Sequence, residues 1–201
     1  MKNKKYIKLI AAIVCLLSLG IGGTFAYMTY RQTVVNTFTV GYNEITVTED
    51  YEPPKEMKQG DNIYKKNVQV KNTGTVPCFI RVYVAFSDGD VEKTSKLSPN
   101  GTNYYPASEY GSHLPDGWKF IPENTDQELG GYYYYTKPVE SGQKTQALFQ
   151  KVNTHFETAE DVKPYEIFVY AESVQTRDKD GMEFTGADPW KSAWTEFLGR
   201  K

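Results

Sequence analysis

Cysteine is nearly absent from this sequence of 201 residues. Of its two cysteines, Cys15 lies in an apolar run near the start, which leaves Cys78 alone in the rest of the chain. A single cysteine cannot form an intrachain disulfide, so we expect a hydrophobic core and not covalent cross-links to stabilise the fold. Cys78 lies in an apolar stretch, which favours a small buried side chain over a nucleophile.

Histidine is equally scarce, and the sequence has none of the common catalytic motifs. His113 and His155 are its two histidines; they lie in different segments, and neither belongs to an HExxH pair. There is also no GxSxG elbow and no phosphate-binding Walker loop. We therefore predict a protein that is not an enzyme, with no catalytic residue, no cofactor and no metal ligand.

One short segment has a weak similarity to a calcium-binding loop. In "DKDGME", residues 178–183, Asp178 and Asp180 alternate and are followed by Gly181, but the other ligands of such a loop are missing. The segment is more typical of a plain turn, and so is "SDGD" at residues 87–90. Whether a calcium ion binds near Asp178 and Asp180 stays open at this point.

Positive charge is concentrated in the first eight residues, "MKNKKYIK". They hold four of the 23 basic residues and none of the 25 acidic ones. Without them the chain has 19 basic and 25 acidic residues, a formal charge of −6. A nucleic-acid partner needs clustered positive charge, so this balance argues against one.

No apolar run has the length of an ordinary membrane-spanning helix. The longest, residues 9–22, has 14 residues, whereas a spanning helix needs roughly 20 and the core of a signal peptide about 7–15. Thr24 and Ala26 place small side chains before a cut at Tyr27. We therefore predict a signal-peptide helix over residues 1–26 and an exported protein. An uncleaved segment, attached to the membrane, is the alternative.

Most of the remaining sequence has the alternation typical of β-strands. Ile45 and Val47 alternate with polar residues, and residues 78–86 carry a wholly apolar face. Turn-forming residues separate such segments. We predict an all-β fold: an antiparallel, jelly-roll-like β-sandwich forming one domain over residues 41–201, with residues 91–115 as a long loop.

One helix is predicted beyond the signal peptide. The segment "DPWKSAWTEFLGRK" begins with Asp188 as a candidate N-cap, followed by a proline at the first helical position. Trp190, Trp194, Phe197 and Leu198 form one apolar stripe at helical spacing. We expect a short C-terminal helix that packs on the sandwich; a helix that binds a partner or a membrane surface is the alternative.

Tyrosine is abundant, with 16 in the chain and four in succession. In a strand, Tyr132 and Tyr134 face one side, while Tyr133 and Tyr135 face the other. An amphipathic ring suits a partly exposed sheet face, an assembly interface or a platform for sugar stacking. Tyr132 and Tyr134 are therefore candidates for a surface-binding site.

Several segments together resemble a known family. "GIGGTFAYMTY" at the end of the signal peptide is followed by "NTFTVG", and further matches are residues 70–84, 133–152 and 167–176. With these segments the chain resembles the TasA/camelysin-like proteins of Gram-positive bacteria, which are exported through a SipW-type signal peptidase. The resemblance covers most of the chain except the 91–115 loop.

The resemblance implies a secreted structural subunit of a fibre in the biofilm matrix or at the cell surface. In that family the N-terminal segment of the mature protein adds as a strand to the next subunit. Residues 27–40 match this segment, and Val34, Val35, Phe38 and Val40 would fill pockets of the neighbour. The implied partners are copies of the chain itself, related fibre subunits and the signal peptidase.

Two other functions are weighed against the fibre subunit. A monomeric adhesion or carbohydrate-binding module on the same sandwich would use Tyr132, Tyr134 and the 91–115 loop. Some relatives are described as metalloproteases, but this sequence has no cluster of zinc ligands, which weighs against that activity.

Overall fold

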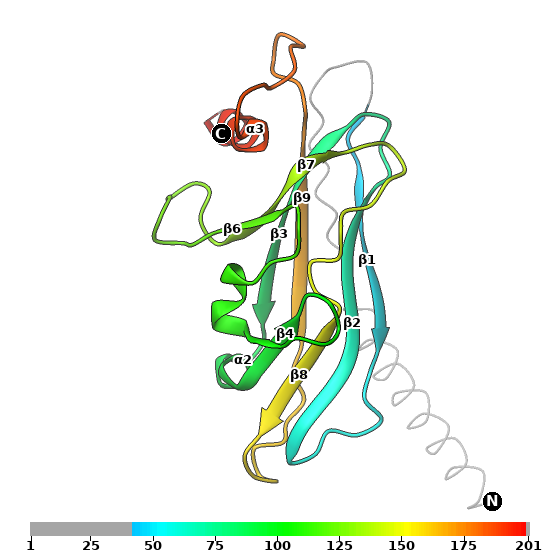
Figure 1. Cartoon of the computed structure of the whole chain (residues 1–201), viewed down its shortest axis with the longest axis vertical. Coiled ribbons are helices and arrows are strands. Elements are labelled where there is room, and N and C mark those ends of the chain that lie inside the picture. Colours follow the sequence, from blue (N-terminus) through cyan, green and yellow to red (C-terminus); the bar gives the residue numbers. More distant parts are fainter. Residues whose placement is uncertain (1–41, 200–201) are drawn as a thin grey trace, which may run out of the picture. The chain divides into compact units, whose positions relative to one another are not determined.

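The computed structural model describes residues 42–199, which belong to one compact unit of the chain, residues 32–201. The strands are β1 (Ile45–Glu52), β2 (Gly60–Asn72), β3 (Cys78–Phe86), β4 (Ser95–Ser98), β5 (Tyr105–Pro106), β6 (Trp118–Ile121), β7 (Tyr132–Val139), β8 (Lys151–Phe156) and β9 (Ile167–Gln175) (Figure 1). The helices are α2 (Gly89–Thr94) and α3 (Pro189–Gly199), with a 3-10 helix η1 (Ala107–Ser112). No helix in the described range is long and apolar enough to cross a membrane.

These strands form two sheets. The order in the five-stranded sheet is β1-β2-β8-β4-β5, and that in the four-stranded sheet is β6-β7-β3-β9. Every strand pair is antiparallel, and the chain passes repeatedly from one sheet to the other. The predicted all-β sandwich with a short C-terminal helix is confirmed, and the predicted signal helix lies outside the described residues.

The main core fills the space between the sheets. Val68 and Val70 of β2 face Ile80 and Val82 of β3, and all four side chains are fully buried. Successive side chains of a strand point to opposite faces, so the apolar residues at alternate positions meet in this layer. Cys78 is buried in the same core, where burial raises the pKa of its thiol to about 12.

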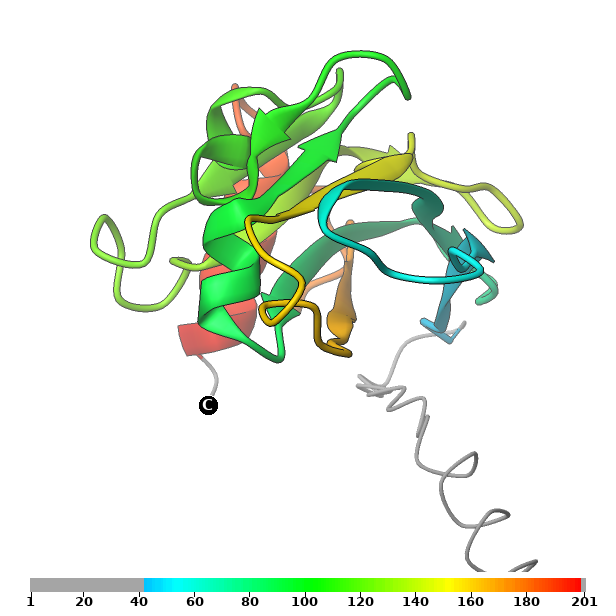
Figure 2. The ribbon, with the colours of Figure 1, turned by 90° about the horizontal axis from the view of Figure 1, so that it is seen from below.

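A second, smaller core lies on the outer face of the four-stranded sheet. There α3 packs Trp190 and Trp194 against Phe79, Tyr134 and Val174, which confirms the apolar stripe expected from the sequence. In both Figure 1 and Figure 2, α3 and β1 lie on opposite sides of the sandwich. Burying a large apolar side chain contributes roughly 1.5–3 kcal/mol, so this layer is a substantial part of the fold.

The region from residue 87 to 115 differs from the sequence prediction. The segment "SDGD" is not a plain turn but the start of α2, where Asp88 Oδ1 accepts hydrogen bonds from the backbone N–H groups of Asp90 and Val91. The expected long loop also contains β4, β5 and η1. β4 is only four residues long and is stabilised by pairing with the distant β8, which local sequence does not reveal.

Candidate functional site

Most of the predicted site residues lie outside the described range. They are Thr24, Ala26 and Tyr27 of the expected cleavage site, and Val34, Val35, Phe38 and Val40 of the expected added strand. These assignments, and the domain boundaries at residues 26 and 40, stay predictions.

The tyrosine run alternates as predicted, but its outward-facing members differ in exposure. Tyr133 and Tyr135 point into the main core, whereas Tyr132 and Tyr134 face outward. Tyr134 is nevertheless fully buried beneath α3, and its hydroxyl donates to Leu129 O at 2.7 Å. Tyr134 is therefore not accessible to a ligand, which removes it as a surface-binding candidate and leaves Tyr132.

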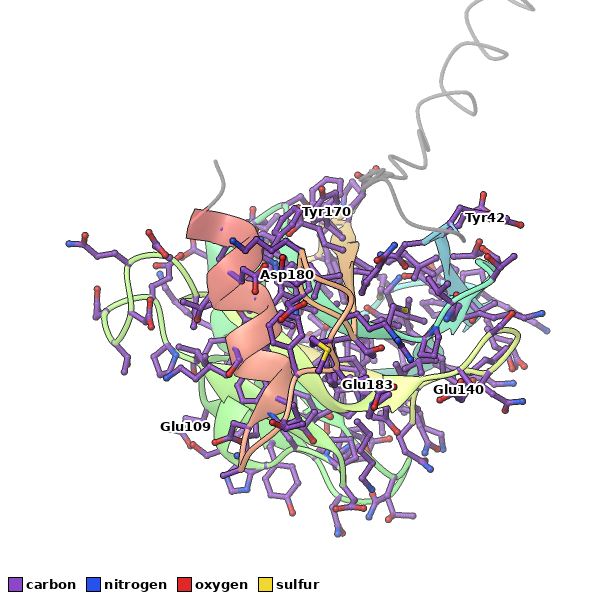
Figure 3. The ribbon with its side chains drawn as sticks, turned by 90° about the horizontal axis from the view of Figure 1, so that it is seen from above. Tyr42, Glu109, Glu140, Tyr170, Asp180 and Glu183 are labelled. Atoms are coloured by element: carbon purple, nitrogen blue, oxygen red, sulfur yellow. The ribbon has the colours of Figure 1, made fainter. Side chains whose placement is uncertain are left out.

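Two further tyrosines lie beside Tyr132 on the outer face. Tyr83 of β3 pairs with Tyr170 of β9, and the Tyr83 ring lies 5.7 Å from the Tyr132 ring. Phe168 follows on β9, and it is 52% exposed. Figure 3 shows Tyr170 at the periphery of the molecule. We name Tyr83, Tyr132, Phe168 and Tyr170 the aromatic surface; the sequence signal for it was the alternation along residues 79–85 and 168–174.

A buried arginine separates the aromatic surface from α3. Arg81 is 3% exposed, and its Nε donates to Glu172 Oε2 at 2.7 Å. Its guanidinium carbon lies 4.0 Å from the centroid of the Tyr132 ring and 4.3 Å from that of Trp194. Arg81 therefore fixes the helix, Tyr132 and β9 in one arrangement.

Among residues 42–199, one side of the main core is only partly covered. β9 ends the strand order of the four-stranded sheet, β1 ends that of the five-stranded sheet, and the two strands contact each other. Val84 and Phe86 of β3 and Ile167 and Val169 of β9 pack on the core here but remain partly exposed. We name this row of four apolar side chains the seam.

The opposite side of the core is covered. There η1 places Tyr110 against Tyr133 and Phe149, and Tyr110 is fully buried. Its hydroxyl donates to Leu148 O at 2.5 Å. A strand could therefore reach the core more easily along the seam than along the η1 side.

The β1 side of the seam carries charge. Lys66 of β2 points between the sheets, and its Nζ lies 2.7 Å from Glu49 Oε2 and 5.3 Å from the centroid of the Tyr51 ring. The Lys66 side chain is only 9% exposed. The apolar part of the seam is thus its β3 and β9 side, which is where an added strand would place its apolar side chains.

The described residues contain no group of three or more His, Cys, Asp or Glu side chains that could hold a metal ion. His155 lies between two carboxylates: its Nδ1 is 3.0 Å from Asp61 Oδ1, and its Nε2 is 3.7 Å from Glu157 Oε1. The hydrogen bond to His155 lowers the pKa of Asp61. His113 instead stacks on Tyr105, with the ring centroids 3.9 Å apart.

Asp178 organises a turn. Its Oδ1 accepts hydrogen bonds from the backbone N–H groups of Asp180 and Met182, both at 2.9 Å. The carboxylate is thus used within its own loop, as the plain-turn interpretation of this segment expects.

Comparison with known protein families finds one match. The family described as camelysin metallo-endopeptidase matches residues 1–101, which include the signal-like segment and the strands from β1 to β4. No curated protein matches the chain. Residues 42–199 provide no fitting set of ligands for the metal ion that the family's description implies.

Proposed function

This chain belongs to the camelysin family, and from that premise we propose that it is an exported, non-catalytic structural subunit of an extracellular fibre. A signal peptidase cuts before Tyr27, and the freed segment of residues 27–40 then adds as a strand to the next subunit. A contact of this head-to-tail kind does not close on itself and therefore yields a filament.

The seam is the observation that carries this proposal. It lies beside β9, the last strand of its sheet in the described range, and it holds four partly exposed apolar side chains next to the core. A strand added along β9 would form main-chain hydrogen bonds and bury those side chains. Each buried apolar side chain contributes up to roughly 1.5–3 kcal/mol, so several together can stabilise a subunit contact.

The path of the chain suggests the direction of the added strand. The first described residues are anchored at one end of the sandwich, where Tyr42 N donates to Thr75 Oγ1 at 3.0 Å. Gly74 is required there, because a Cβ at this position would lie 2.5 Å from Tyr42 O. Tyr42 thus lies at the end of the sandwich where β3 begins and β9 finishes, and the proposed strand of residues 27–40 would be donated from that end.

In a head-to-tail filament this segment would enter the next subunit at the opposite end, where Ile167 pairs with Phe86. Read from residue 27 to residue 40, it would then run against the direction of β9. The resulting pair would be antiparallel, like every other strand pair of the sandwich.

The side-chain pattern selects the buried face of the segment. Val34, Phe38 and Val40 lie at alternate positions and share one face, whereas Val35 shares the other face with threonines. The first face is the more apolar and would be turned to the seam. Of the four residues expected at the interface, Val35 would then remain on the outside.

The decisive experiment is negative-stain electron microscopy of two proteins, one beginning at Tyr27 and one beginning at Gly41. We expect filaments from the first and monomers from the second, because only the first carries the added strand. Filaments from the protein that begins at Gly41 would overturn the mechanism. Monomers from both would leave a monomeric binding module as the better interpretation.

A pair of neighbouring substitutions tests the proposed orientation. Val34→Asp would place a carboxylate in the seam and abolish filaments, whereas Val35→Asp would place it in solvent and leave them intact. The two variants have the same composition and differ only in whether the aspartate stands at position 34 or 35. Loss of filaments in Val35→Asp alone would reverse the assignment of the faces.

The family's description also raises a peptidase as a second candidate. Hydrolysis of casein by the purified protein, with and without a chelator, tests it directly. We expect no hydrolysis under either condition. Chelator-sensitive cleavage would replace the structural role with an enzymatic one.

A further inference from the structure

The aromatic surface has no role in the proposed assembly. It lies on the outer face of the four-stranded sheet, whereas the seam lies on the inner face of the same strands. Tyr83 is 39% exposed and Phe168 is 52% exposed. A contiguous group of exposed aromatic side chains is typical of a binding site.

The three tyrosines lie in one row across three adjacent strands. Tyr132 is on β7, Tyr83 is on β3 and Tyr170 is on β9, in the strand order β7-β3-β9. Neighbouring strands are about 4.8 Å apart, so the row extends roughly 10 Å across the sheet. The rings of Tyr83 and Tyr132 are tilted by 53°. We name this row of three tyrosines the platform.

Polar groups accompany these rings. Each tyrosine carries a hydroxyl group, and the Tyr170 hydroxyl donates to Glu172 Oε1 at 3.2 Å. Glu172 is ion-paired with Arg81, so the charge next to the platform is balanced. A partner that fits must combine apolar faces with hydroxyl groups and carry no strong charge.

We propose that the aromatic surface binds a neutral polysaccharide, whose sugar rings stack on the tyrosines. The C–H face of a pyranose matches the face of an aromatic ring, and its hydroxyl groups match the tyrosine hydroxyls. A polyanion is disfavoured, because the chain beyond the first eight residues has a formal charge of −6. The partner is thus a neutral glycan.

The platform is held in place before any ligand arrives. Arg81 packs on the Tyr132 ring, and Glu172 accepts the hydrogen bond of Tyr170. Side chains that are already ordered lose little conformational entropy on binding, which favours the stacking of a ligand on them.

The test is isothermal titration of the purified protein with two neutral hexasaccharides, cellohexaose and the hexamer of N-acetylglucosamine. We expect binding of at least one, and a roughly tenfold weaker affinity for Tyr83→Ala, as the loss of one stacked ring implies. Tyr51→Ala is the matched control, because Tyr51 is 46% exposed but lies on the other sheet. Its affinity should be unchanged.

Two further variants distinguish a loss of sugar binding from misfolding and from a loss of assembly. Phe168→Ser changes an exposed residue of the aromatic surface and should also weaken binding, even if Tyr83→Ala is unstable. Val34→Asp, expected to be monomeric, should bind the sugar as the unaltered protein does. Binding of neither hexasaccharide, or equal weakening by Tyr83→Ala and Tyr51→Ala, would overturn the proposal.

Discussion

The two halves of the outer face of the four-stranded sheet are built from similar residues but differ in exposure. In the half beneath α3, Phe79 is 1% exposed and Tyr134 is 0% exposed. In the other half, Tyr83 is 39% exposed and Phe168 is 52% exposed. Both halves carry aromatic side chains of β3 and β7, namely Phe79 and Tyr134 beneath α3 and Tyr83 and Tyr132 in the exposed half. The position of α3, and not composition, therefore separates a structural aromatic cluster from a candidate binding surface.

Arg81 marks the boundary between the two halves. It packs on Trp194 on the covered side and on Tyr132 on the exposed side. Its ion pair with Glu172 ties β3 to β9 at the same level of the sheet. The exposed half thus depends on the covered half for its geometry, although it contributes less to the free energy of folding.

The largest effect is expected from Trp194→Ala in the covered half. Trp194 is fully buried, and truncating such a side chain costs about 4 kcal/mol in the free energy of unfolding, through lost burial and the cavity that remains. Urea denaturation followed by circular dichroism measures this difference.

Two control variants make that comparison sharper. Phe168→Ala in the exposed half should change the free energy of unfolding by no more than about 0.5 kcal/mol. Trp194→Phe should cost much less than Trp194→Ala, because among the described residues the buried Nε1 of Trp194 has no hydrogen-bond partner to lose. Equal losses for Trp194→Ala and Phe168→Ala would show that the two halves are not energetically distinct.

The next largest effect is expected from Arg81→Ala at the boundary. It leaves the mostly buried Glu172 without its positively charged partner, which costs about 3 kcal/mol in the free energy of unfolding. Replacing both residues, as Arg81→Met with Glu172→Leu, should restore most of that stability, because no unpaired charge then remains. Urea denaturation of both variants measures this recovery, and a double variant as unstable as Arg81→Ala would contradict the explanation.

The sequence predicts the sandwich and α3 because both rest on local periodicity. Ile45, Val47 and the strand at 78–86 alternate with period two, and the tryptophans of α3 recur at helical spacing. It does not predict α2 or β4. α2 buries only Val91, so its pattern is too short to distinguish from a turn, and β4 forms through pairing with β8.

The candidate site was less predictable, for a related reason. Tyr132 and Tyr134 are equivalent in the sequence, and only the later segment of α3 decides that Tyr134 is covered. The outward-facing apolar residues Phe79 and Val174 are the signal that could have located the helix over that half. Tyr83 and Tyr170 join Tyr132 only once the pairing of β3 with β9 and β7 is known.

The smallest expected effect concerns the pH at which the buried tyrosines ionise. Burial raises the pKa of Tyr133 from 10.0 to about 12, and burial also raises the pKa of Tyr134. The stabilisation linked to the neutral hydroxyl of Tyr133 is complete below pH 10 and is lost as the pH rises through 12, and the raised pKa of Tyr134 acts in the same direction. We expect tyrosinate absorbance to rise in two steps, the first from exposed rings in the intact fold and the second together with the loss of circular dichroism. A single step, complete while the circular dichroism is unchanged, would contradict the burial of Tyr133 and Tyr134.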